Sequence, residues 1–222
     1  MTRRFLVGTC VAALLAAGAA SPKWNGPIAM ASAERPSIAP YASGGLKLFV
    51  GVAAAPVADT PGGAPFATLY VSAVVAMAGI KAGATHVTSR LWLHGDAIAP
   101  GPLYTAPKGV EIGWLDGLRG VRAVVGSAGN GWTLVEIDGY LPTAAVVDNL
   151  ETVWRGAELD YRFICADCHT THAAKDYSSM QWGIIMPRMA RNARLAPDAA
   201  LVILKWLQTT SFASDTRGPM AP

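Results

Sequence analysis

The stretch Gly131-Trp132-Thr133-Leu134-Val135-Glu136-Ile137-Asp138-Gly139-Tyr140-Leu141-Pro142 carries the clearest fold signal in this chain of 222 residues. Its first half is rich in the aromatic and β-branched residues that favour strands. Asp138-Gly139 is a dipeptide typical of a tight turn between two strands. The sequence therefore predicts a strand over 132–137, a turn at 138–139 and a further strand after it.

Short runs of the same kind precede this stretch, at 70–75, 87–94 and 121–125. In the second run, apolar Val87, Leu91 and Leu93 alternate with polar Thr88, Arg90 and His94, as in a strand with one buried face. The 23 glycines and 15 prolines of the chain supply many turn signals. We therefore expect all-β structure over residues 46–150, as one unit with an extension or as two units.

The pattern becomes helical from Asp148 onward. Residues 151–164 lack proline and place apolar residues at a period close to 3.6. A second helix is expected through Arg191, with Ser178 or Ser179 as its cap, and a third over 199–208 after Pro197. The predicted fold class is α+β, an all-β barrel region followed by a small all-α domain over 151–212.

Composition and charge narrow the class of protein. Hydrophobic residues make up 52% of the chain and charged residues 15%, so the chain can bury a core. The formal net charge is +3 and no run of lysine or arginine occurs, which argues against nucleic-acid binding.

Residues 1–33 are expected to be a secretory signal peptide and linker. Arg3 and Arg4 precede the apolar stretch 5–20, and cleavage could follow Ala20 or Ala33. The alternative is an uncleaved anchor, but the stretch is short for a bilayer span. We expect export to the periplasm and no stable membrane span after cleavage.

Two cysteines remain outside this leader, since Cys10 lies within it. Both belong to Cys165-Ala166-Asp167-Cys168-His169, which has the spacing of a covalent haem-attachment site. The two thiols can add to the two vinyl groups of one porphyrin, and the histidine then reaches the iron as an axial ligand. A zinc site would need more ligands, and a thioredoxin-like motif would need a βαβ context. The motif predicts one covalently bound haem c with His169 as an iron ligand.

Methionine or histidine supplies the second axial ligand of haems that transfer electrons. Trp182, Ile185, Met186 and Met189 follow the spacing i, i+3, i+4, i+7 and form one stripe of a helix shortly after the motif. Met189 and Met186 are both candidates, and Met180 lies one turn earlier. The ordinary role of such a stripe is core packing, but a helix that covers a haem would serve both purposes.

Other side chains near the motif are weaker candidates. Tyr161 precedes Cys165 by four residues, which predicts that its ring lies near the haem edge. His172 follows His169 too closely to reach the opposite side of the iron. His86 and His94 lie on predicted strands and are expected at the surface or in satisfied contacts.

Two resemblances extend this interpretation. The order of elements over 102–147 resembles a bacterial SH3-like barrel, with Gly131-Trp132 and Gly139-Tyr140-Leu141 at its characteristic places.

The C-terminal part resembles the terminal monohaem domain of TorC-type cytochromes, which serve trimethylamine N-oxide reductases. The match covers about 50 residues and is carried by these positions: Tyr161, Cys165, Cys168, His169, Gln181, Trp182, Met189, Arg191, Leu195, Leu207 and Gln208. The resemblance implies a monohaem cytochrome c domain with Met189 as the sixth ligand. The further haem motifs of the TorC type are missing here, so this chain cannot itself be the quinol-oxidising subunit.

These observations lead to one functional expectation and two alternatives. We expect a periplasmic monohaem c-type cytochrome, not itself an enzyme, which passes single electrons to or from a partner. The partner would be a redox enzyme, with a molybdenum N- or S-oxide reductase as one candidate, or a quinol-oxidising cytochrome. The alternatives are a haem-based sensing or regulatory module and a scaffold in which binding by the SH3-like part matters and the haem serves assembly.

Overall fold

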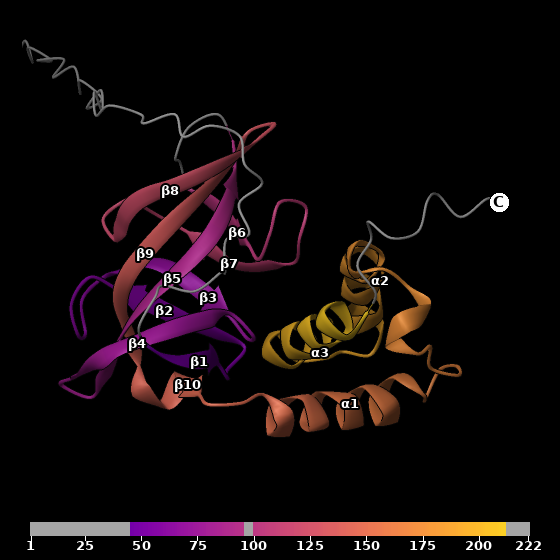
Figure 1. Cartoon of the computed structure of the whole chain (residues 1–222). Coiled ribbons are helices and arrows are strands. Elements are labelled where there is room, and N and C mark those ends of the chain that lie inside the picture. Colours follow the sequence, from indigo (N-terminus) through magenta and orange to yellow (C-terminus); the bar gives the residue numbers. More distant parts are fainter. Residues whose placement is uncertain (1–44, 96–99, 212–222) are drawn as a thin grey trace, which may run out of the picture. The chain divides into compact units, whose positions relative to one another are not determined.

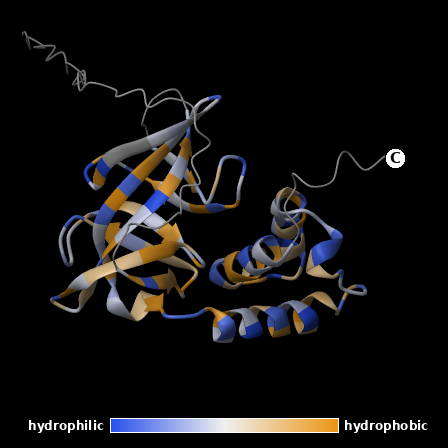
Figure 2. Cartoon of the chain, viewed as in Figure 1, coloured by the Kyte–Doolittle hydropathy of each residue, from blue (hydrophilic) through white to orange (hydrophobic). Residues whose placement is uncertain are grey.

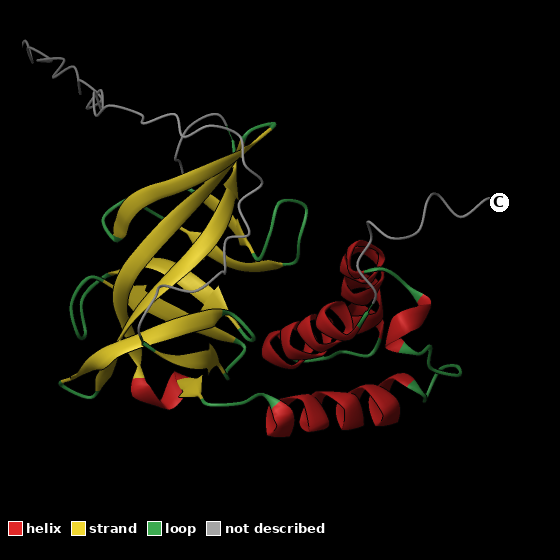
Figure 3. Ribbon diagram, in the orientation of Figure 1, coloured by secondary structure: helices red, strands yellow, loops and turns green. Residues whose placement is uncertain are grey.

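The computed structural model describes residues 45–95 and 100–211, which form antiparallel strands followed by three helices (Figures 1 and 3). The strands are β1 (Leu46–Val50), β2 (Ala54–Ala58), β3 (Pro65–Tyr70), β4 (Val74–Lys81), β5 (Ala84–His94), β6 (Gly101–Tyr104), β7 (Glu111–Leu115), β8 (Val121–Gly129), β9 (Trp132–Pro142) and β10 (Val146–Val147). The helices are α1 (Glu151–Cys165), α2 (Ser179–Asn192) and α3 (Pro197–Thr210), with short 3-10 turns at Thr143–Ala145 and Ala174–Asp176.

Six of the strands close into a barrel in the order β5-β6-β7-β3-β2-β9, because β9 pairs back onto β5. The remaining strands extend this sheet: β8 pairs with β9, while β4, β1 and β10 follow from β5. Strands from residues 45–95 and from residues 100–211 therefore share one barrel. Closure leaves none of the six strands with a fully free edge.

Strands β5 and β9 form a long antiparallel pair in the barrel. All eleven residues of β5 pair with β9, from Ala84 opposite Pro142 to His94 opposite Trp132. Both strands alternate buried and less buried residues, and Figure 2 shows hydrophobic and hydrophilic segments alternating along them. The predicted strand 87–94 is confirmed, with Val87, Leu91 and Leu93 buried.

The predicted strand over 70–75 is wrong. Tyr70 ends β3 and Val74 begins β4, and the chain turns between them. Ser72 has a φ of +76°, a left-handed conformation that a strand does not contain. Val71 and Ala73 are apolar because they are buried in this turn. A buried turn has no periodicity that distinguishes it from a short buried strand.

The predicted turn at Asp138-Gly139 is also wrong, since β9 runs through both residues. Gly139 is required there by a close approach. A Cβ on Gly139 would lie 2.7 Å from the backbone oxygen of Ala58 and 2.7 Å from Cγ1 of Val57. The glycine thus marks the place where β2 pairs closely with β9, and a close backbone approach is the other common role of glycine in a strand.

The helices lie where the sequence predicts them. Ser178 caps α2: its hydroxyl accepts from the Gln181 N–H, while the Gln181 side chain accepts from the Ser178 N–H. Pro197 begins α3, and Asp198 lies in its first turn. None of the helices in the described residues combines the length and apolar character that crossing a bilayer needs. The predicted leader and Cys10 lie outside the described residues.

The predicted fold class, however, is wrong in its second half. The chain is mostly β with a closed six-stranded barrel, and the three helices do not form a separate small all-α cytochrome c domain. The described residues belong to one compact unit. Lys205 of α3 is buried and donates to the backbone oxygen of Glu111 in β7, and this hydrogen bond links the helix to the barrel.

Candidate functional site

Helix α1 presents the Cys-x-x-Cys-His motif at its C-terminal end. Cys165 is the last residue of the helix and is buried, whereas Cys168 and His169 lie exposed in the following loop. Both cysteines are free thiols. Burial, and then the neighbouring Cys168, raise the pKa of the Cys165 thiol. The motif therefore has one thiol anchored in the helical core and one accessible from solvent.

The imidazole of His169 has one nitrogen engaged and one free. Its Nδ1 lies 2.8 Å from the backbone oxygen of Thr170. Because a carbonyl only accepts hydrogen bonds, Nδ1 is the donor, and in the neutral ring Nε2 keeps its lone pair. Ligating histidines are held in this way, through a hydrogen bond from the nitrogen that does not bind the metal.

The predicted stripe of α2 faces the helical core. Trp182 and Met186 are fully buried, while Ile185 and Met189 are partly buried at the edge of the same cluster. Trp182 also donates from Nε1 to the backbone oxygen of Ala174 at 2.7 Å. The stripe thus contains one methionine in the core and one at its margin. Met180 lies away from the core, with 63% of its surface exposed.

Tyr161 links α1 to the loop after the motif. It is buried, and its hydroxyl donates to the backbone oxygen of His172 at 2.9 Å. Its ring meets Trp206 of α3 at 5.6 Å and Trp182 of α2 at 6.2 Å, measured between centroids. Burial raises the pKa of Tyr161 to about 12, so it remains a neutral donor.

The structure therefore brings Tyr161, Cys165, Trp182 and Met186 into one cluster, with Met189 at its edge. The sequence did not single out Trp206, whose ring packs against Tyr161. Its apolar position on the third helix was visible, but a helical period alone does not reveal which ring it meets.

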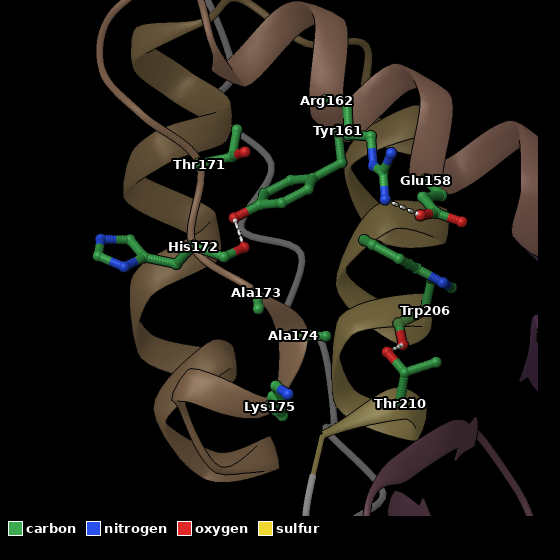
Figure 4. A pocket seen from close by; sticks show the side chains of 10 residues that line it. All are labelled: Glu158, Tyr161, Arg162, Thr171, His172, Ala173, Ala174, Lys175, Trp206 and Thr210. Atoms are coloured by element: carbon green, nitrogen blue, oxygen red, sulfur yellow. Dashed lines mark hydrogen bonds and ion pairs between the residues drawn. The ribbon is translucent and has the colours of Figure 1, made fainter.

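A pocket of about 580 Å³ lies beside the loop that follows the motif (Figure 4). It is lined by Glu158, Tyr161, Arg162, Thr171, His172, Ala173, Ala174, Lys175, Trp206 and Thr210. Figure 4 shows Tyr161 reaching across to the backbone of His172. Of the predicted site residues only Tyr161 belongs to the lining, so the pocket adjoins the motif without containing its thiols or imidazole.

The other histidines have partners on the barrel. His86 Nε2 lies 2.9 Å from Asp138 Oδ1, and its ring stacks on Tyr140. His94 packs against Trp132. The sequence expectation that neither is a ligand stays a prediction, but these contacts give each ring a role in the barrel.

The donor set fits a c-type haem. The described residues contain no cluster of three or more His, Cys, Asp or Glu that could hold a bare metal ion. A haem needs less from the protein, namely one or two axial ligands in addition to the porphyrin. Two free thiols and an imidazole with a free Nε2 provide the attachment points and one ligand.

Comparison of the chain with protein-family models, with curated proteins and with solved structures gave no match. Inferences about function therefore rest on the chemistry of the site.

Proposed function

We propose that this protein is a periplasmic monohaem c-type electron carrier. The observation that carries the proposal is the pentapeptide 165–169 at the end of α1, with two free thiols and an uncommitted Nε2 on His169. The same spacing serves covalent haem attachment in c-type cytochromes. The leader expected over 1–33 supports export to the compartment where such haems are attached.

Each residue of the site has a defined task in this proposal. Cys165 and Cys168 would hold the haem covalently through their thiols, and His169 and Met189 would bind its iron. Trp182 and Tyr161 supply apolar surface beside the group. Bound haem provides a one-electron iron couple whose potential depends on its axial ligands, hydrogen bonds and burial.

A haem iron held by both His169 and Met189 would exchange electrons without binding substrate. The protein would therefore act as a carrier and not as an enzyme. Its partner would be a periplasmic redox enzyme, for example a molybdenum N- or S-oxide reductase, or a quinol-oxidising cytochrome. Such partners meet through small, transient interfaces.

Spectroelectrochemistry of protein purified from the periplasm of a host with haem-attachment machinery tests this function. We expect one reversible transition that fits a single electron. His169→Ala should remove the wild-type transition, whereas His172→Ala, a change of the exposed histidine three residues later, should retain it. A protein that carries haem but shows no reversible one-electron couple would exclude the carrier function.

Haem-based sensing is a second candidate, favoured by the position of Met189. This side chain lies at the edge of the helical cluster, whereas Met186 lies inside it. A ligand at the edge can leave the iron without opening the core. Rapid carbon monoxide binding by the reduced protein would favour sensing, and no binding would favour electron transfer.

A further inference from the structure

The arginines of the described residues fall into two groups. Those on the barrel and on α1 all lie within ion-pair distance of a carboxylate: Arg90 with Glu136, Arg119 with Asp59, Arg122 with Asp138, Arg155 with Glu151 and Arg162 with Glu158. Arg188, Arg191 and Arg194 are exposed, and the described residues offer them no carboxylate within that distance. Unpaired arginine is therefore confined to one segment of the structure.

That segment also carries exposed apolar side chains. Met180, Ile184, Pro187, Arg188 and Arg191 share the face of α2 opposite buried Trp182 and Met186, and all five are exposed. Ile184 exposes 74% of its surface and Met180 exposes 63%. We call these five residues, with Arg194 just beyond the helix end, the outer α2 face.

Helix electrostatics explain only part of this arrangement. A cation in the last turn, such as Arg191, is stabilised by the helix dipole. Arg188 lies further from the helix end, and the dipole gives no reason for exposed Ile184. α2 contains no acidic residue, so no carboxylate on the helix itself compensates the charge.

We propose that the outer α2 face docks the acidic surface of a protein redox partner. This inference rests on the proposed electron-carrier function, since Met189 of the same helix is the expected axial ligand. The arginines provide planar forks that match carboxylates, and Met180 and Ile184 provide a small apolar centre. Arginine and methionine are enriched in protein interfaces and lysine is depleted, and the outer α2 face contains no lysine.

The charge of this face should speed encounter with an acidic partner more than it tightens the complex. Exposed ion pairs are individually weak, but a field of one sign raises association rates and is screened by salt. A transient carrier requires this combination, because it must leave its partner after each transfer.

A binding experiment tests the face without any haem signal. The probe is a synthetic amphipathic helical peptide of glutamate and leucine, and the control peptide carries lysine in place of glutamate. We expect the acidic peptide to bind wild-type protein at low ionic strength. The triple variant Arg188→Gln/Arg191→Gln/Arg194→Gln should weaken binding about tenfold, and Ile184→Ser should also weaken it.

The matched control is Arg119→Gln/Arg122→Gln/Arg155→Gln, which removes the same charge from paired arginines. Equal weakening by the two triple variants would overturn the proposal. Stronger binding to vesicles of anionic phosphatidylglycerol than to the acidic peptide would also overturn it, in favour of a lipid surface.

A kinetic arm links the face to electron transfer. Anionic ferricyanide takes one electron from the ferrous protein and becomes ferrocyanide. We expect its rate to fall about tenfold in the Arg188/Arg191/Arg194 variant and little in the matched control. The cation hexaammineruthenium(III), reduced by one electron to its ruthenium(II) form, should react faster with that variant. Haem-containing protein with unchanged rates would refute the docking face alone, whereas protein without haem would refute the carrier function itself.

Discussion

Lys205 in α3 donates a hydrogen bond from Nζ to the backbone oxygen of Glu111 in β7 at 2.5 Å, although only 3% of the lysine is exposed. Nζ also lies 3.1 Å from Gln208 Oε1 and 5.5 Å from the ring centroid of Tyr70 in β3. A buried ammonium needs such partners, since an unpaired one is costly. The residue therefore ties the last helix to the barrel.

Burial lowers the pKa of Lys205 from 10.5 to about 8, against the smaller opposing effect of Glu111. The unfolded chain then holds this proton more tightly than the folded one. Stability contributed by Lys205 is lost as pH falls through about 8, and the free energy of unfolding rises with pH above that value. Urea unfolding of wild type should show a rise of roughly 1 kcal/mol between pH 7.5 and 9 that is missing in Lys205→Met.

Lys175→Met is the control for this measurement, because Lys175 is exposed. It should keep the pH dependence of wild type. The measurement stops at pH 9 because Tyr161 adds a second pH dependence above pH 10. Its pKa is raised in the folded protein, so its contribution to the free energy of unfolding decreases as pH rises above 10. A Lys205→Met protein with the wild-type slope would contradict this account of the lysine.

Gly139→Ala should destabilise the barrel. The new methyl group would press on the backbone of β2 at Ala58, and backbone cannot move aside as a flexible side chain can. We expect a loss of about 1–3 kcal/mol, measured by urea unfolding. Gly156→Ala is the control: Gly156 is exposed on α1 and a Cβ there would meet nothing within 4 Å, so the change should stabilise by about 0.5–1 kcal/mol. Unchanged stability of Gly139→Ala would mean that β2 does not approach β9 as described.

Ser178→Ala should weaken the start of α2 by about 1 kcal/mol, because it removes the cap on the Gln181 N–H. Ser179→Ala, one residue later, should change thermal stability little. Equal effects of the two substitutions would argue against Ser178 as the cap.

The two methionines of α2 should respond differently to truncation. Met186→Ala should lower stability by about 2–5 kcal/mol, because it opens a cavity in the helical cluster. Met189→Ala should cost less stability and remove the methionine-to-iron charge-transfer band of the oxidised haem protein. Loss of that band in Met186→Leu, with retention in Met189→Ala, would reverse the assignment.

The sequence predicted local structure well where one period dominates. Val87, Leu91 and Leu93 indicated β5, and the stripe from Trp182 to Met189 indicated the buried side of α2. Prediction failed where tertiary contacts determine the local conformation. Asp138-Gly139 has the same local sequence signal in a turn as in a strand that a neighbouring strand approaches closely. Only the neighbouring strand β2, which lies far away in the sequence, distinguishes the two cases.

The link between helices and barrel was also invisible in the sequence. Lysine is rarely buried, so Lys205 in an amphipathic helix is expected to face solvent. Its partners lie in β7 and β3, far away in the chain, and no helical period reveals them. The motif at 165–169 could be found because its chemistry depends on local spacing. The hydrogen bond from His169 Nδ1 to Thr170 required the folded loop.

The proposed function depends on covalent attachment of one haem through Cys165 and Cys168. Intact-mass spectrometry of denatured protein from a host with haem-attachment machinery measures this directly. We expect a mass increase of one haem in wild type that survives denaturation and acid extraction, and that is lost in Cys165→Ser/Cys168→Ser. Wild-type protein at the mass of the bare polypeptide, from a host that loads a control c-type cytochrome, would contradict it.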